Sequence, residues 1–201
     1  ANSTHDMLSR LETMVLQEKL TTKEDLDRYV KNYMKLLPFN NLGIMMLAWQ
    51  RADDPDFLRQ LDEVSMAVKT PREVREGTVK LCRRFLKLWK QLREYKSLAW
   101  YQEEVKEGRC IGDHSIAVGL YAREIGLEQE LAGAVYVYNL ITSIVTNAVK
   151  TVPLSQIAGQ QILNQALEQV EECVAKAKEV EKEDLGVGGT QMDIAAMNHE
   201  T

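Results

Sequence analysis

The sequence predicts an all-α protein, folded as a single helical bundle-like domain of about eight to ten helices. Three observations lead to this prediction. No segment alternates apolar and polar residues between turn residues, as a half-buried strand would. Apolar residues recur instead at three- and four-residue spacing along most of the chain. Several of these periodic segments begin with capping residues and end at proline or glycine.

The first helix is expected to begin at the capping-box pattern Thr21-Thr22-Lys23-Glu24 and to end at Pro38. Two shorter helices should follow at residues 41–52 and 56–68. A capping threonine and a proline at the first helical position then predict a longer helix from Thr70-Pro71-Arg72-Glu73 to about Tyr95. Its expected core-facing side chains are Val74, Leu81, Cys82, Phe85, Leu88, Trp89 and Leu92.

The second half of the chain carries further helix signals. Ser97 is expected to cap a short helix that ends near Lys106, and Asp113 to cap one that ends at Gly126. An uncharged helix then stops before Pro153, and one long helix is expected from Ser155 to the charged run at residues 176–184. We expect one domain over residues 1–201, with residues 1–10 atypical and residues 186–201 a C-terminal segment after a glycine joint.

The composition is that of a soluble globular protein: 45% of the 201 residues are hydrophobic and 27% are charged. A formal net charge of -5 argues against a nucleic-acid partner, since such proteins are usually basic. The cysteines Cys82, Cys110 and Cys173 form no disulfide or zinc spacing, which favours reduced thiols and a cytoplasmic location. The polar start of the sequence has no secretory-signal pattern.

One segment, Leu131 to Val149, is nineteen residues long without a charge, which is long enough to span a membrane. Polar residues interrupt it, among them Asn139, Thr142 and Asn147. A central core helix surrounded by other helices explains the same pattern, and we favour that reading, with no membrane partner.

Catalytic and metal-binding motifs are absent from the sequence. It contains no P-loop, nucleotide-binding glycine motif, nucleophile elbow or zinc-binding histidine pair. Cys110 and His114, four residues apart, are a thiol–imidazole pair that can bind a soft metal, but two ligands alone rarely form a site. We therefore expect no metal site, no cofactor and no enzyme activity, and keep Cys110 and His114 as candidate ligands of a metal carrier.

Two groups of exposed residues are candidate partner surfaces. Arg83, Arg84 and Lys87 lie on one face of the expected 70–95 helix, opposite its apolar stripe. Such a face can bind an acidic protein, touch nucleic acid or be merely solvated. Lys150 ends the uncharged helix, and Gln156 and Gln160 open the next. This corner can contact a partner or be a hydrogen-bonded turn.

The segment from Asn147 to Gln160, N-A-V-K-T-V-P-L-S-Q-I-A-G-Q, resembles the signature of the urease accessory protein F family. Three more segments are similar to that family in the same order: Leu11-Glu12, the segment from Asp113 to Gly119, and the ending from Asp193 to Thr201. Two features depart from the family pattern. Residues 1–10 do not match the motif that precedes Leu11-Glu12, and the chain stops at Thr201 where the family continues.

The resemblance implies an all-α, non-catalytic adaptor that is frequently a homodimer. Its partners would be the urease accessory proteins D (also called H) and G, the latter a GTPase, and apo-urease, to which nickel is delivered. The family regulates the GTPase step. By position, the resemblance assigns partner binding to Glu12, Lys150, Gln156, Gln160, His199 and Glu200.

Overall fold

The computed structural model describes residues 20–187, except residue 71 and the side chain of residue 73. Within these ranges every regular element is helical, which confirms the all-α prediction. The α-helices are α2 (Lys23–Leu36), α3 (Asn41–Gln50), α4 (Pro55–Ala67), α5 (Arg72–Leu92), α6 (Lys96–Lys106), α7 (His114–Glu124), α8 (Gln129–Thr151), α9 (Gln156–Leu167) and α10 (Val170–Lys178). Two 3-10 turns, η1 (Leu37–Phe39) and η2 (Lys182–Asp184), complete the described elements.

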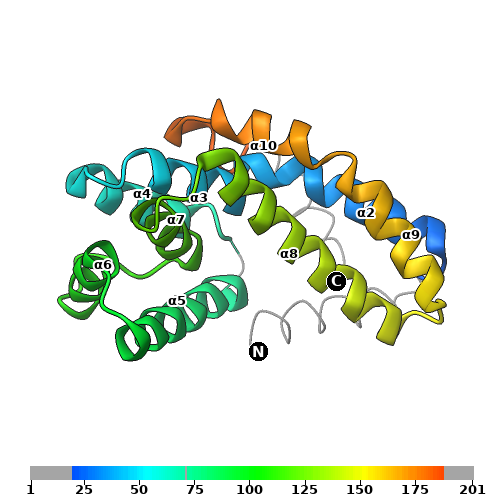
Figure 1. Ribbon diagram of the computed structural model, residues 1–201, viewed down its shortest axis with the longest axis horizontal. Coiled ribbons are helices and arrows are strands. Elements are labelled where there is room, and N and C mark those ends of the chain that lie inside the picture. Colours follow the sequence, from blue (N-terminus) through cyan, green and yellow to red (C-terminus); the bar gives the residue numbers. More distant parts are fainter. Residues whose placement is uncertain (1–19, 71, 188–201) are drawn as a thin grey trace.

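The helices pack around two clusters of buried apolar side chains that meet at α3. Seven consecutive residues of α3, from Leu42 to Ala48, are buried, so this helix is enclosed on all sides. One cluster lies among α2, α8, α9 and α10, and the other among α4, α5, α6 and α7. Figure 1 shows α5 and α6 on the left and the α8–α9 corner at the far right of the molecule.

The approach of α7 to α3 depends on a glycine. A Cβ atom at Gly119 would lie 2.3 Å from the carbonyl oxygen of Met45 and 2.9 Å from the Cβ of Ala48. Only a residue without a side chain permits this distance between the two backbones. Gly119 therefore sets the spacing of the two helices that join the clusters.

The predicted cap at Asp113 is confirmed, and two other predicted caps are wrong. Asp113 accepts hydrogen bonds from the backbone N–H groups of Ser115 and Ile116, as expected. The first capping box is one residue later than predicted, since Thr22 and Asp25 form it. Ser97 does not cap α6; the carboxylate of Glu124 instead accepts from the N–H groups of Lys96 and Ser97, at 2.6 and 2.8 Å. A tertiary contact supplies this cap.

The single long helix expected from Ser155 is also wrong. It is divided into α9 and α10 at residues 168–169, where no proline or glycine stands. Packing explains the division, because α9 packs against α2 and α8 whereas α10 packs against η1, α3 and α8. Two predicted core residues of α5 are likewise exposed: the exposed fractions of Leu88 and Leu92 are 50% and 65%.

Helix α8, which contains the uncharged segment 131–149, is the one described helix whose length and apolar composition would allow it to cross a membrane. Of the most apolar 18-residue stretch of this helix, 44% is buried in the protein. Its buried face packs against α9, α10 and α3, which favours the interpretation of α8 as a core helix.

Candidate functional site

The predicted residues Lys150, Gln156 and Gln160 lie together at the corner between α8 and α9. All three are exposed. Gln156 and Gln160 are one helical turn apart, so their side chains share one face of α9. Ile157 beside them is 70% exposed, which is unusual for a large apolar side chain. The corner therefore presents a cation, two amides and an apolar side chain to solvent.

The shape of this corner follows from its local sequence. Val152 ends α8, with its side chain 1% exposed and its N–H donating to the carbonyl of Ala148. Pro153 breaks the helix, and the hydroxyl of Ser155 accepts from the N–H of Ala158 at the start of α9. A Cβ at Gly159 would lie 2.6 Å from a methyl carbon of Val149, so glycine permits the close packing of α9 on α8.

The second predicted surface is the outer face of α5. Arg83, Arg84 and Lys87 are exposed, as the sequence predicts. The opposite side of α5 packs against α7 and α6. Figure 1 shows that this helix lies far from the α8–α9 corner. The structure thus presents two separate candidate surfaces.

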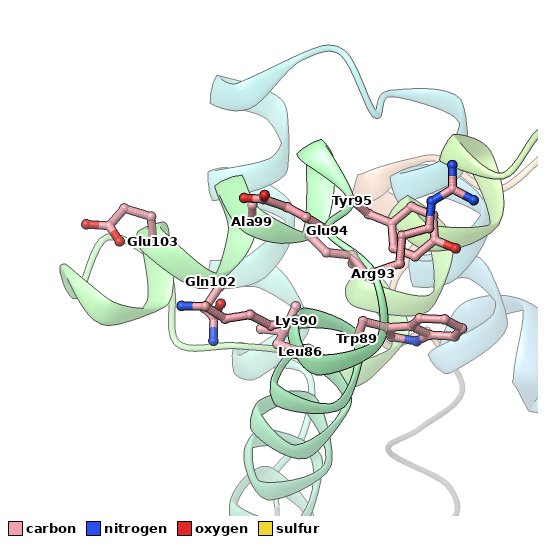
Figure 2. Close-up of a pocket in the computed structure, with 10 residues that line it drawn as sticks. Leu86, Trp89, Lys90, Arg93, Glu94, Tyr95, Ala99, Gln102 and Glu103 are labelled. Carbon is pink, nitrogen blue, oxygen red and sulfur yellow. The ribbon is translucent and has the colours of Figure 1, made fainter.

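A shallow hollow of about 220 Å³ adjoins the end of α5. Its lining side chains come from α5, from the turn after it and from α6 (Figure 2). Trp89, Tyr95 and Leu98 give it an apolar part, and its charged lining residues are Lys90, Arg93, Glu94 and Glu103. The indole of Trp89 stacks on Tyr121, with the ring centroids 4.4 Å apart, so this part of the wall is fixed by packing.

The candidate metal ligands Cys110 and His114 both lie in the protein interior. Cys110 is 4% exposed, and burial raises the pKa of its thiol to about 12, so the thiolate that binds soft metals is disfavoured. Burial also lowers the pKa of His114, whose ring meets Phe85 edge to face at 5.5 Å. Among the described residues, no group of three or more metal-binding side chains comes together.

A buried polar network holds the loop in front of α7, and the sequence analysis missed most of it. Asp62 accepts from the hydroxyl of Tyr101 at 2.5 Å and from the N–H groups of Ile111 and Gly112 at 2.6 and 3.0 Å. The hydroxyl of Tyr101 in turn accepts from the N–H of Asp113 at 2.8 Å. The network therefore links α4, α6 and the loop at residues 110–113.

Asp113 also forms a buried ion pair. The ammonium of Lys69 lies 2.7 Å from its carboxylate, and their side chains are 9% and 0% exposed. Burial opposes ionisation of Asp113, but the charge and hydrogen bond of Lys69 hold the pKa of this carboxyl below its usual value. Burial raises the pKa of Asp62, despite its three hydrogen bonds. No sequence spacing connects positions 62, 69, 101 and 113, so only the fold could reveal the cluster.

These acids do not resemble an active site. Asp62 and Asp113 are 1% and 0% exposed, so no substrate reaches them. Their oxygens are occupied by backbone N–H groups, a tyrosine and a lysine. The network explains instead how α7 is placed, because Asp113 is both its N-terminal cap and a partner of α4 and α6 through Tyr101 and Asp62.

Comparison with known proteins decides the family. The model of the UreF family matches residues 20–167, which is more than half of the chain. The chain belongs to the UreF family. Over 193 residues it is 33% identical to urease accessory protein UreF of Actinobacillus pleuropneumoniae serotype 5b, covering 94% of this chain and 85% of that protein.

Similar UreF proteins occur in other bacteria. The protein of Haemophilus influenzae strain PittGG is 32% identical over 193 residues, which are 94% of this chain and 82% of that protein. That of Bacillus sp. strain TB-90 is 30% identical, with 94% and 85% covered. The resemblance inferred from the sequence is thereby confirmed. Membership in a family of urease accessory proteins implies a non-catalytic role.

The remaining predicted site residues of this UreF-family chain, Glu12, His199 and Glu200, lie outside the described residues. The structure thus brings together Lys150, Gln156 and Gln160, and separately Arg83, Arg84 and Lys87. Ile157 is an exposed addition that the sequence analysis did not select. Its position, one after Gln156 on an amphipathic helix, was a signal that could have identified it.

Proposed function

We propose that this protein is an adaptor in nickel insertion into urease, which assembles with the accessory D/H protein, the GTPase G protein and apo-urease in the cytoplasm. It performs no bond-making step of its own and regulates the GTPase step of its partner. The observation that carries the proposal is the exposed corner of Lys150, Gln156, Ile157 and Gln160, formed by the very segment that resembles the family signature.

The physical argument rests on the rigidity of this corner. The backbone of the corner is held by the buried Val152, the Ser155 cap and the packing at Gly159, so little backbone entropy is lost when a partner binds. A cation and an apolar side chain surrounded by amides form the kind of small mixed patch that binds a protein partner.

A urease-activation assay, combined with size-exclusion chromatography of the chain with the D/H and G proteins, tests the proposal. We expect co-elution, and we expect Lys150→Ala to reduce activation while circular dichroism stays unchanged. Lys35→Ala, an exposed lysine in the last turn of α2, is the matched control and should activate normally. Absence of co-elution contradicts the adaptor function. Unchanged activation by Lys150→Ala removes Lys150 from it.

We also propose that the protein is a homodimer. Leu131, Val135 and Tyr138 are exposed to 52%, 45% and 44% and share one face of helix α8. A contiguous apolar face of this kind commonly marks a protein interface. Sedimentation equilibrium should give twice the mass of the 22.9 kDa chain, and the mass of a single chain would contradict the proposal.

The second candidate function is direct nickel carriage through Cys110, His114 or His199. The buried thiol, whose raised pKa disfavours the thiolate, argues against Cys110, and the packing of the imidazole against Phe85 argues against His114. Equilibrium dialysis with nickel decides between the functions. If nickel binds and the binding is lost in the Cys110→Ala, His114→Ala double variant, the carrier function is supported; binding that survives the double variant excludes these two ligands.

A further inference from the structure

The charge of this chain is distributed very unevenly. Residues 72–92 carry seven basic and two acidic side chains, a formal charge of +5, whereas the whole chain has -5. The rest of the chain therefore carries -10. Within residues 80–92 there are five basic side chains and no acidic one. A positively charged helix on a protein of negative net charge is a local electrostatic feature, not a result of the overall composition.

The outer face of α5 is also partly apolar. We define the α5 face by its exposed residues Lys80, Arg83, Arg84, Lys87 and Gln91. Leu88 and Leu92, exposed to 50% and 65%, border it on one side. Lys90, on the other side, lines the hollow together with Trp89 and Tyr95 (Figure 2). These two leucines, one helical turn apart, add apolar area next to the cations.

We propose that the α5 face and the adjoining hollow bind an acidic amphipathic helix of a partner protein. The inference deepens the proposed adaptor function, on which it rests, by assigning a second surface and the chemistry of what it binds. The carboxylates of the bound helix lie along the α5 face, and one large apolar side chain of that helix enters the hollow.

The spacing of the cations favours a helical partner. Lys80, Arg84 and Lys87 follow one another at intervals of one helical turn, over about 10 Å of the α5 axis at ~1.5 Å per residue. A helix lying alongside would place acidic residues at three- and four-residue spacing opposite this row. The hollow supplies an apolar anchor site next to the charges, and anchors of this kind dominate binding energy at protein interfaces.

A nucleic acid fits this surface less well. The charge of -10 on the rest of the chain repels a long polyphosphate, and its charge-driven binding requires many cations. Leu88 and Leu92 would lie next to phosphate groups, with which apolar side chains make no favourable contact. A short acidic helix, in contrast, uses both the cations and the leucines.

The test uses the whole chain and two fluorescein-labelled peptides of identical composition. In one peptide, glutamates form one helical face beside leucines and a phenylalanine; in the other, the same residues are scrambled. Binding is followed by fluorescence anisotropy at 50 and 200 mM salt, with a DNA duplex as competitor. We expect the ordered peptide to bind at least 10-fold tighter than the scrambled one, and its affinity to fall with salt.

Variants locate the binding surface. Arg83→Glu with Lys87→Glu should weaken binding of the ordered peptide at least 10-fold, and Leu88→Gln with Leu92→Gln should weaken it several-fold. The matched control is Arg28→Glu with Lys35→Glu on α2, which changes the net charge by the same amount at exposed positions. Its affinity for the ordered peptide should stay within twofold of that of the parent. All these side chains are exposed, so the fold should survive, and circular dichroism checks this.

Several results would overturn the inference. Equal affinity for both peptides would mean binding by charge alone, and displacement of the ordered peptide by stoichiometric DNA would indicate a nucleic-acid surface. Salt-sensitive self-association that is lost in the Arg83→Glu, Lys87→Glu variant would assign the face to a second copy of the chain. If the accessory proteins co-elute equally with this variant, the α5 face is wrong while the adaptor function stands. If the accessory proteins co-elute with neither the parent chain nor the variant, the adaptor function itself fails.

Discussion

Lys69→Met tests the physical account of the buried network most directly. Methionine keeps most of the length of the lysine side chain but removes its charge and its three donors. The variant leaves the carboxylate of Asp113 at 0% exposure without its cation, and the carbonyl of Ser65 without the 3.0 Å hydrogen bond from Lys69. The backbone of α7 still needs the Asp113 cap, so the carboxylate cannot move to solvent without damaging the helix start.

The expected cost is large. Removing one partner of a buried ion pair typically costs about 3–5 kcal/mol, because the other charge stays buried and uncompensated. For a protein of this size the melting temperature falls by roughly 2–4 °C per kcal/mol, so we expect a drop of roughly 6–20 °C. The matched variant is Lys69→Met with Asp113→Asn, which removes both charges, keeps a side chain able to cap, and should recover more than half of the loss.

The pH dependence of stability gives a second readout with a defined sign. In the parent protein the pKa of Asp113 is lowered, so its contribution is complete above the unfolded pKa of about 3.9 and is lost as the pH falls below it. Without Lys69, burial raises this pKa in the folded state, so the folded protein binds more protons and stability falls as the pH rises above 4.

Urea unfolding of the parent, single and double variants between pH 4 and pH 8 measures both effects. A loss below about 1 kcal/mol in Lys69→Met would refute the account, because that is the range of an exposed pair. So would a double variant no more stable than the single one, or a loss of stability in Lys69→Met, relative to the parent, that does not grow as the pH rises above 4.

Two further predictions concern packing and charge elsewhere in the chain. Gly119→Ala should destabilise the protein by about 1–3 kcal/mol or more, because the new methyl meets the Met45 carbonyl at 2.3 Å; Gly133→Ala should cost much less, because the atom at 2.3 Å is the flexible methyl end of Met46. Thermal unfolding compares the two, and equal losses would contradict the explanation. Hydrogen bonds from Arg59 and Arg109 lower the pKa of Glu104 from 4.5 to about 2, so its contribution to stability is present above pH 4.5 and is lost as the pH falls toward 2. In Glu104→Gln the free energy of unfolding should therefore depend less on pH between these values. An unchanged pH dependence would show that the ion pairs of Glu104 with the arginines contribute little.

The sequence predicted those elements whose signals are local. Asp113 as a cap, Pro153 as a break and Gly126 as a helix stop all act within a few residues, so the pattern alone located them. The corner of Lys150, Gln156 and Gln160 was found in the same way. The errors came where distant parts of the chain decide: Glu124 caps α6 in place of Ser97, and α10 separates from α9 where no breaker residue stands.

By itself, the sequence determined that the chain is all-α, that it belongs with the urease accessory protein F family and where its corner motif lies. Helical periodicity, caps and motifs depend on residues that are close together in the sequence, so they can be recognised without the fold. Only the tertiary structure decided that Leu88 and Leu92 face solvent, and that Asp62, Lys69, Tyr101 and Asp113 meet in the interior. Burial and ion pairing depend on which helices pack together, and residues tens of positions apart have no spacing that records their contact.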